Sequence, residues 1–177
     1  LGFGDTALTL QAQVNNYAKP TFSKTSGAGS LGGSGFDFLL DFGTLTAGSG
    51  MVSALLQLAN DVVGPADLLD GAYSFALNEF LKSGFASFAD LRAGEAQVGL
   101  EIAFDALNVG SFSDTIVLSA VGHNGSGYSA AFQDIRLTVQ ARVQAGGGNQ
   151  IPEPGTLLLL TIAMAIIVLQ RRRGMLD

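Results

Sequence analysis

The chain has 177 residues, a formal net charge of −6 at pH 7 and no cysteine. The acidic balance argues against a nucleic-acid partner, because nucleic-acid binding rests on Lys and Arg neutralising phosphates. The absence of cysteine excludes disulfides, thiol nucleophiles and thiolate metal sites, so the protein must be held together by its core. The roughly 145 residues before the C-terminal tail are enough for one such core.

Seven segments have the composition or the alternation of strands. In the first, Ala7, Thr9, Gln11 and Gln13 alternate with apolar residues, which is typical of a half-buried strand. The seven predicted strands are Asp5–Val14, Phe36–Phe42, Met51–Asn60, Ala72–Leu77, Gln97–Phe104, Ser113–Val121 and Asp134–Val143. Turn-forming residues separate them, so we predict an all-β, antiparallel β-sandwich over residues 1–144. The segment Glu79–Leu91 is open to a short helical turn.

Two glycine-rich stretches flank predicted strands. Within Ser26–Gly35, the glycines from Gly27 to Gly32 match the spacing of a dinucleotide-binding loop. That loop needs a preceding strand and a following helix, whereas a polar segment precedes this one and a predicted strand follows it. We therefore predict a flexible loop here, and a Gly-rich linker at residues 145–151.

The sequence offers few groups of polar residues that could form a catalytic site. His123 is the only histidine, with Ser126 and Ser129 nearby and Asp134 further on, in the setting of a strand-connecting loop. Nearness in sequence does not make a catalytic triad, so we predict a non-enzymatic protein that needs no cofactor. Asn124-Gly125-Ser126 fits the N-glycosylation pattern, which we interpret as chance.

Two weaker binding hypotheses concern acidic and aromatic residues. Asp67 and Asp70 offer hard carboxylate oxygens for Ca²⁺, but their loop lacks the acidic density of a dedicated calcium loop, which favours a solvated acidic turn. Tyr17, Tyr73 and Tyr128 are candidates for a sugar-binding surface, although tyrosine in a sandwich is more often half-buried packing.

The chain ends in a proline-bracketed glutamate, an apolar run and three arginines. The run Gly155–Gln170 carries no charge and is apolar on all sides, which predicts a single transmembrane helix rather than a buried core helix. The fifteen residues from Gly155 to Leu169 reach as a helix only about 22 Å across a hydrocarbon core of roughly 30 Å, so the span is short. Pro152 and Pro154 prevent the helix from extending backwards. The cluster Arg171, Arg172 and Arg173 predicts a cytoplasmic C-terminus.

This order of elements resembles the PEP-CTERM sorting signal of Gram-negative bacteria. Pro152, Glu153 and Pro154 correspond to its name-giving motif, and the apolar run and Arg171–Arg173 follow it. The resemblance implies that a membrane-embedded exosortase recognises and cleaves a tail at 152–177, and that the protein reaches the cell surface or the extracellular polymer matrix. Such proteins usually carry an N-terminal secretory signal, so we interpret Leu1 as the start of a mature chain or of a fragment.

A second resemblance covers roughly Leu39 to Val143. Its segments are LLDFGTL (Leu39–Leu45), LQLAND (Leu56–Asp61), AGEAQVGLEIAFD (Ala93–Asp105), VGSFSDTIVLSA (Val109–Ala120) and IRLTVQARV (Ile135–Val143). These are similar to the choice-of-anchor, immunoglobulin-like repeats of bacterial surface proteins, here with a core repeat at about 36–144. The resemblance implies an immunoglobulin-like sandwich, and the family has no catalytic site whose residues could be assigned to positions in this sequence. The glycine-rich segment Ser26–Gly35, which precedes Phe36, is longer than the tight turn that the usual form of the family needs.

Together these observations predict an exported structural or interaction protein that is displayed at the surface or released into the matrix. The expected partners are an exosortase-type enzyme and, through the C-terminal helix, the inner membrane. The alternatives are a polysaccharide- or calcium-binding surface module and a permanently anchored single-span protein.

Overall fold

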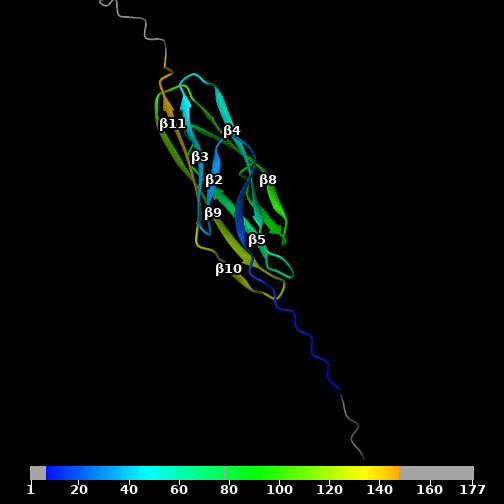
Figure 1. Ribbon diagram of the computed structural model, residues 1–177. Helices are drawn as coiled ribbons and strands as arrows, with labels where there is room; N and C mark the ends of the chain where they lie inside the picture. Colours follow the sequence, from blue (N-terminus) through cyan, green and yellow to red (C-terminus); the bar gives the residue numbers. More distant parts are fainter. Residues whose placement is uncertain (1–6, 78, 148–177) are drawn as a thin grey trace, which may run out of the picture. The chain divides into compact units, whose positions relative to one another are not determined.

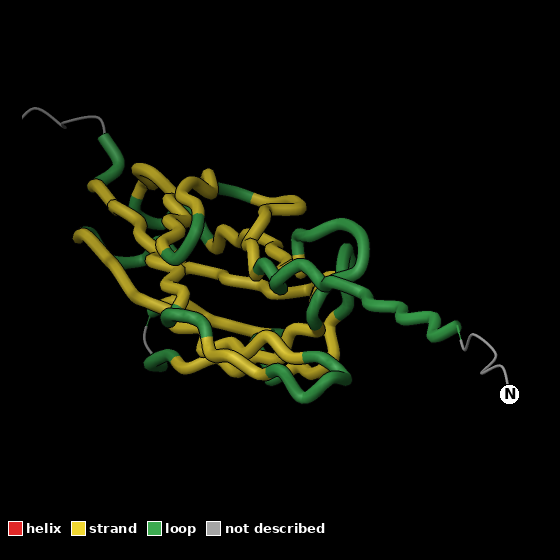
Figure 2. The backbone as a smooth tube through the Cα atoms, turned by 90° about the horizontal axis from the view of Figure 1, so that it is seen from below, coloured by secondary structure: helices red, strands yellow, loops and turns green. Residues whose placement is uncertain are grey.

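The computed structural model describes residues 7–77 and 79–147, and within these ranges it contains strands and no helix. Two sheets face each other (Figures 1 and 2). The first sheet has the order β1 (Pro20–Gly27), β4 (Met51–Asn60), β8 (Ala96–Asp105), β6 (Phe80–Ser83). The second has the order β2 (Ser30–Ser34), β3 (Asp37–Thr46), β11 (Ile135–Gln144), β9 (Gly110–His123), β5 (Leu68–Ser74), β7 (Phe88–Leu91), with β10 (Ser129–Ala131) also paired to β9. The predicted all-β sandwich is confirmed.

Alternating burial produces the core between the sheets. Along β11, Ile135, Leu137, Val139, Ala141 and Val143 are buried, while the residues between them are more exposed. This is the period of two that places successive side chains on opposite faces of a sheet. The predicted strands at Met51–Asn60, Gln97–Phe104, Ser113–Val121 and Asp134–Val143 were recognisable for this reason, and they correspond to β4, β8, β9 and β11.

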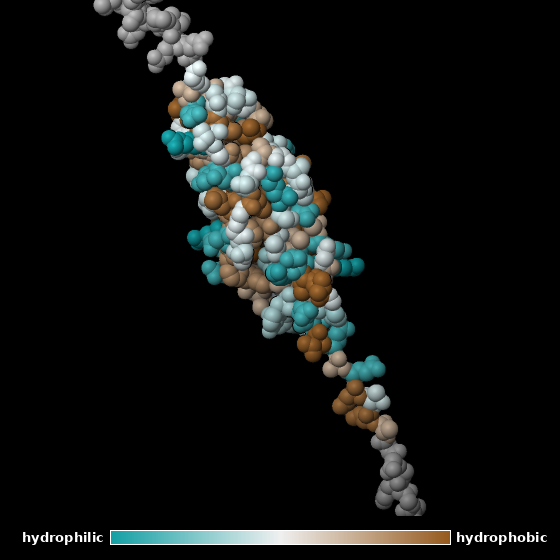
Figure 3. Space-filling model, in the orientation of Figure 1, coloured by the Kyte–Doolittle hydropathy of each residue, from teal (hydrophilic) through white to brown (hydrophobic). Residues whose placement is uncertain are grey.

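The predicted strand Asp5–Val14 is wrong for the residues that the structure describes. Residues 7–14 have no regular structure and are exposed, with Leu8, Leu10 and Val14 each more than 80% accessible. Figure 3 shows both the apolar and the polar side chains of this segment open to solvent. Alternation gives an amphipathic strand only where a sheet edge accepts it, and within the described part of the chain no such pairing begins before the isolated bridge at Asn16.

The glycine-rich loop and the helical turn are also corrected. Ser26–Gly35 contains the end of β1 and the whole of β2, and Glu79–Leu91 contains β6 and β7. Gly27 and Gly33 have positive φ, and a Cβ on either would collide with the backbone of the neighbouring strand. The glycines therefore allow close strand pairing rather than flexibility.

The second sheet is mixed rather than purely antiparallel. β11 pairs with β9 in antiparallel fashion and with β3 in parallel, in the register Leu137 to Phe38 and Val139 to Leu40. A parallel pair needs a long crossover, and here it is supplied by all the strands that lie between β3 and β11 in the chain.

A buried ion pair joins the two layers. Lys82 on β6 pairs with Asp114 on β9, and the Lys82 side chain is fully buried. The Lys82 ammonium also donates to the carbonyl oxygens of Ala76 and Phe80, each at 3.0 Å. Because removal of either partner would leave a buried charge, this pair ties the short edge strand β6 to the opposite sheet.

Asn60, at the end of β4, is a fully buried polar residue that joins three segments. Its side-chain oxygen accepts from the Lys19 amide at 2.9 Å, and its side-chain nitrogen donates to the carbonyls of Asp67 and Leu91, both at 3.0 Å. One amide group therefore fixes the entry to β1, the start of β5 and the end of β7.

We expect Asn60→Ala to lower the free energy of unfolding by about 2 to 4 kcal/mol, because it leaves a buried amide and two carbonyls without their partners. Urea denaturation followed by circular dichroism measures this. Asn108→Ala, at an exposed asparagine, is the matched control and should change stability little. Equal stability of the two variants would contradict the role given to Asn60.

Candidate functional site

Most of the polar residues highlighted by the sequence gather where β5 begins and β9 ends. Leu68 on β5 is the register partner of His123 on β9, so the loops that precede Leu68 and follow His123 lie together. The segment before β1 joins them, because the Asn16 amide donates to Pro65 O at 2.8 Å and the Asp67 amide donates to Asn16 O at 2.9 Å. This backbone clamp positions the neighbouring residue Tyr17.

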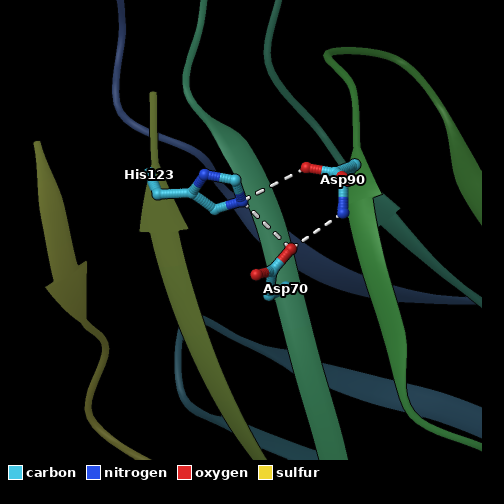
Figure 4. A group of neighbouring side chains, drawn as sticks. All are labelled: Asp70, Asp90 and His123. Atoms are coloured by element: carbon cyan, nitrogen blue, oxygen red, sulfur yellow. Dashed lines mark hydrogen bonds and ion pairs between the residues drawn. The ribbon is translucent and has the colours of Figure 1, made fainter. Parts of the chain in front are cut away.

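Asp70, Asp90 and His123 form a cluster on the adjacent strands β5, β7 and β9 (Figure 4). His123 Nε2 lies 3.1 Å from Asp70 Oδ1 and 3.5 Å from Asp90 Oδ1. The Asp90 backbone amide donates to Asp70 Oδ1 at 2.8 Å, with Asp90 in the left-handed region at φ 56°. This backbone hydrogen bond, followed by the bond to His123 and its charge, lowers the pKa of Asp70 against an opposing effect of burial.

The same cluster has the chemistry of a divalent-metal site. One ligand atom from each of its three residues lies within 4.8 Å of the others. An imidazole nitrogen with two carboxylate oxygens suits zinc and similar ions better than Ca²⁺, which prefers oxygen ligands alone. Asp67, which the calcium hypothesis pairs with Asp70, is not one of these three residues.

Asp67 instead belongs to a network of side-chain amides. Its side chain is buried, and Oδ1 accepts from Asn124 Nδ2 at 2.7 Å and more weakly from Asn15 Nδ2 at 3.5 Å. Asn124 Oδ1 in turn accepts from the Ser126 amide at 3.1 Å and from its hydroxyl at 2.6 Å. Asn124-Gly125-Ser126, which has the glycosylation pattern, is thus a turn whose side chains are committed to internal hydrogen bonds.

The three tyrosines separate into two groups. Tyr17 and Tyr128 lie with ring centroids 5.8 Å apart, and both are solvent-exposed. Tyr73 packs against Phe22, Phe85 and Phe88, and its hydroxyl donates to Gln97 at 2.8 Å, so burial raises its pKa. Tyr17 and Tyr128 are therefore available to a ligand, whereas Tyr73 is a packing residue.

In the described part of the chain, no side-chain hydrogen bond joins the candidate catalytic residues to one another. His123 Nε2 faces two carboxylates, Ser126 bonds to Asn124, and Asp134 accepts from the Ser119 hydroxyl at 2.9 Å. Ser129 is the register partner of His123 on β10. The contacts of Asp90, Asn15 and Asn124 could not be found from the sequence, because they come from separate loops with no shared motif.

The remaining predicted site residues, Pro152, Glu153, Pro154 and Arg171–Arg173, lie outside the described residues, as does the predicted helix Gly155–Gln170. Residues 150–173 match the PEP-CTERM protein-sorting motif. The C-terminal segment is a PEP-CTERM sorting signal. This supports export to the cell surface or the extracellular space. In the described residues, no helix has the length and apolar character to span a membrane.

Several solved structures resemble the sandwich. The ASH/PapD-like domain of human CEP192 is 11% identical, with a TM-score of 0.48 over 82% of this chain and 99% of that domain. WR4, a member of the MSP family from C. elegans, is 10% identical, with a TM-score of 0.36 over 55% of this chain and 91% of WR4. AggA, the major subunit of aggregative adherence fimbriae type I from Escherichia coli, is 12% identical. Its TM-score is 0.38 over 76% of this chain and 100% of AggA. No curated protein matches the sequence.

The lowered pKa of Asp70 predicts a pH-dependent contribution to stability. Asp70→Asn should cost up to about 1 kcal/mol at pH 7, because the carboxylate is 41% exposed and solvent screens its interactions. A lowered folded-state pKa stabilises the protein above the unfolded value near 4, and this contribution disappears as the pH falls through the folded value.

Urea titrations at a series of pH values from about 7 down to about 2 cover this window. The difference between wild type and Asp70→Asn should shrink at the acid end, while the exposed Asp105→Asn makes the same change of charge as a control. A difference that stays constant across the series would contradict the assigned interaction.

Proposed function

We propose that the protein is an exported, non-enzymatic structural or interaction protein of the cell surface or extracellular matrix, sorted and cleaved at its tail by an exosortase. The observation that carries the proposal is the match of residues 150–173 to the PEP-CTERM sorting motif. A sorting motif determines where a protein is delivered and not what it does there. The function of the delivered protein therefore belongs to the β-sandwich.

Pro152, Glu153 and Pro154 act as the recognition element. Each proline lacks an amide donor and pushes the preceding residue toward extended geometry, which keeps this segment out of the helix that follows. An extended backbone between two prolines presents the Glu153 side chain and the peptide bonds to a processing enzyme.

Gly155–Gln170 then holds the tail in the inner membrane, and Arg171, Arg172 and Arg173 hold its end on the cytoplasmic side. A short span is compatible with this role, because flanking arginines reach toward the interface and the bilayer can thin locally. The sandwich thus stands on the non-cytoplasmic side of the inner membrane until it is cleaved from its tail.

The body supports a durable extracellular role. It contains no cysteine and so depends on no redox chemistry. Apolar packing, the Lys82–Asp114 pair and the Asn60 hydrogen bonds hold its layers and loops instead. A sandwich stabilised in this way suits a scaffold that carries binding loops at its ends.

Replacement of Pro152, Glu153 and Pro154 by alanine in the native host should abolish processing and retain the protein in the membrane fraction. Intact-mass and C-terminal peptide analysis of the protein from the surface or medium measures this. Alanine at Gly146, Gly147 and Gly148 is the matched control, because it changes three neighbouring residues and leaves the motif intact.

The wild-type and control proteins should end near Pro152 to Gly155. An unchanged mass and location of the triple-alanine variant would refute exosortase sorting. A wild-type surface protein that still ends at Asp177 would show instead that Gly155–Gln170 is a permanent single-span anchor.

A further inference from the structure

Two hollows adjoin the Tyr17–Tyr128 pair at the end of the sandwich. The larger has a volume of about 470 Å³ and is lined mainly by polar side chains, among them Gln13, Asn15 and Asn124. The smaller has a volume of about 240 Å³ and is lined mainly by apolar groups, among them Ala130 and Phe132. Tyr17, Tyr128 and Asp67 line both, so the two hollows form one groove with a polar part and an apolar part.

The walls of this groove are held in place by hydrogen bonds. The Asn16 backbone is clamped to Pro65 and Asp67, which fixes the base of Tyr17. On the opposite wall the Asn124 amide donates to Tyr128 O at 3.0 Å and closes the turn before Tyr128. Side chains presented on such fixed backbones lose little entropy when a ligand binds.

The charges of the groove restrict its ligand. The residues that line it in the described part of the chain include the Asp67 carboxylate and neither Lys nor Arg. A sulfated, phosphorylated or uronic-acid ligand would meet a negative charge without a compensating cation. Partial desolvation, with the nearby Tyr17 and Asp67, raises the pKa of Tyr128, so its hydroxyl stays neutral and can donate a hydrogen bond.

Calcium is disfavoured by the orientation of the amides. Asn124 turns its NH₂ group toward Asp67, and its carbonyl oxygen is occupied by Ser126. Ca²⁺ needs six to eight oxygen ligands, whereas the ligands assembled around Asp67 are N–H donors. Side-chain amides at the edge of the groove, beside two exposed aromatic rings, instead suit a ligand rich in hydroxyl groups.

We propose that this groove binds a neutral saccharide, with the Tyr17 and Tyr128 rings packing against the apolar face of a sugar ring. The side-chain amides of Gln13 and Asn15 supply the polar edge that faces the sugar hydroxyls, and the buried Asp67 carboxylate holds Asn15 and Asn124 in place beside it. Aromatic rings supply a large apolar contact surface and the phenol groups a polar one, which matches the two-sided character of a pyranose. The larger hollow falls in the size range of small-ligand sites, roughly 300 to 1,000 Å³.

This inference goes beyond the proposed sorting of the protein and does not depend on it. The groove belongs to the sandwich, and the sorting signal to residues 150–173. A failure of saccharide binding would leave the sorting proposal standing, and a failure of tail processing would leave the groove intact.

The test is a titration of the purified full chain, kept in lauryldimethylamine oxide so that no sugar-based detergent competes. The probes are cellohexaose, maltohexaose and N-acetylchitohexaose, with hexagalacturonate as the anionic comparison. The chain has three tyrosines and no tryptophan, and two of these tyrosines line the groove, so tyrosine emission reports on the site directly.

At least one neutral hexasaccharide should bind saturably with a Kd at or below about 1 mM. Tyr17→Ala should weaken binding roughly tenfold or more, which corresponds to the loss of about 1.4 kcal/mol, while Tyr17→Phe keeps the ring and most of the affinity. Tyr17 is 71% exposed, so both variants should fold, as their circular dichroism would show. Phe36→Ala removes an exposed aromatic ring outside the groove and should leave binding unchanged.

The proposal is overturned if none of the three neutral probes binds saturably with a Kd at or below about 1 mM. It is also overturned if Tyr17→Ala binds as tightly as wild type, or if hexagalacturonate binds more tightly than every neutral probe.

Discussion

The loops at one end of this protein depend on a single buried amide. Asn60 is bonded to the segment before β1, to the loop before β5 and to the end of β7, so it fixes where Tyr17, Asp67 and Asp90 lie. A buried polar group of this kind is stable only when all its partners are present, and each of these segments therefore depends on the correct placement of the other two. The candidate groove and the Asp70–Asp90–His123 cluster inherit their geometry from it.

The two polar clusters at this end have different characters. Asp70, Asp90 and His123 lie on three neighbouring strands and satisfy one another through short contacts. The residues around Asp67 come from loops and line a hollow that remains open to solvent. The first arrangement fastens β7 to the sheet, and the second presents a surface. Binding residues commonly lie on loops held by a rigid scaffold, and this division of labour follows that rule.

The sequence predicted the strands that make up the core and missed those at the edges. β4, β8, β9 and β11 are long and apolar on one face, so their periodicity is visible. β1 and β2 are rich in polar residues and glycine, because an edge strand has few neighbours to pack against and its glycines serve close backbone approach. Residues 7–14 have the strand pattern without an edge to join. At the site, residue types alone suggested Tyr17, Tyr128 and Asp67, but their convergence depends on tertiary contacts that no local pattern encodes.

The position of β11 has a consequence for the timing of biogenesis. This strand lies between β3 and β9 in the middle of its sheet, although it is the last strand in the described part of the chain. The second sheet therefore cannot close until residues 135–144 have been synthesised, and its central pairing joins segments about a hundred positions apart. Such non-local pairing folds slowly. In a chain that crosses a membrane with its N-terminus first, the second sheet can therefore close only after residues 135–144 have emerged, shortly before residues 150–173 follow.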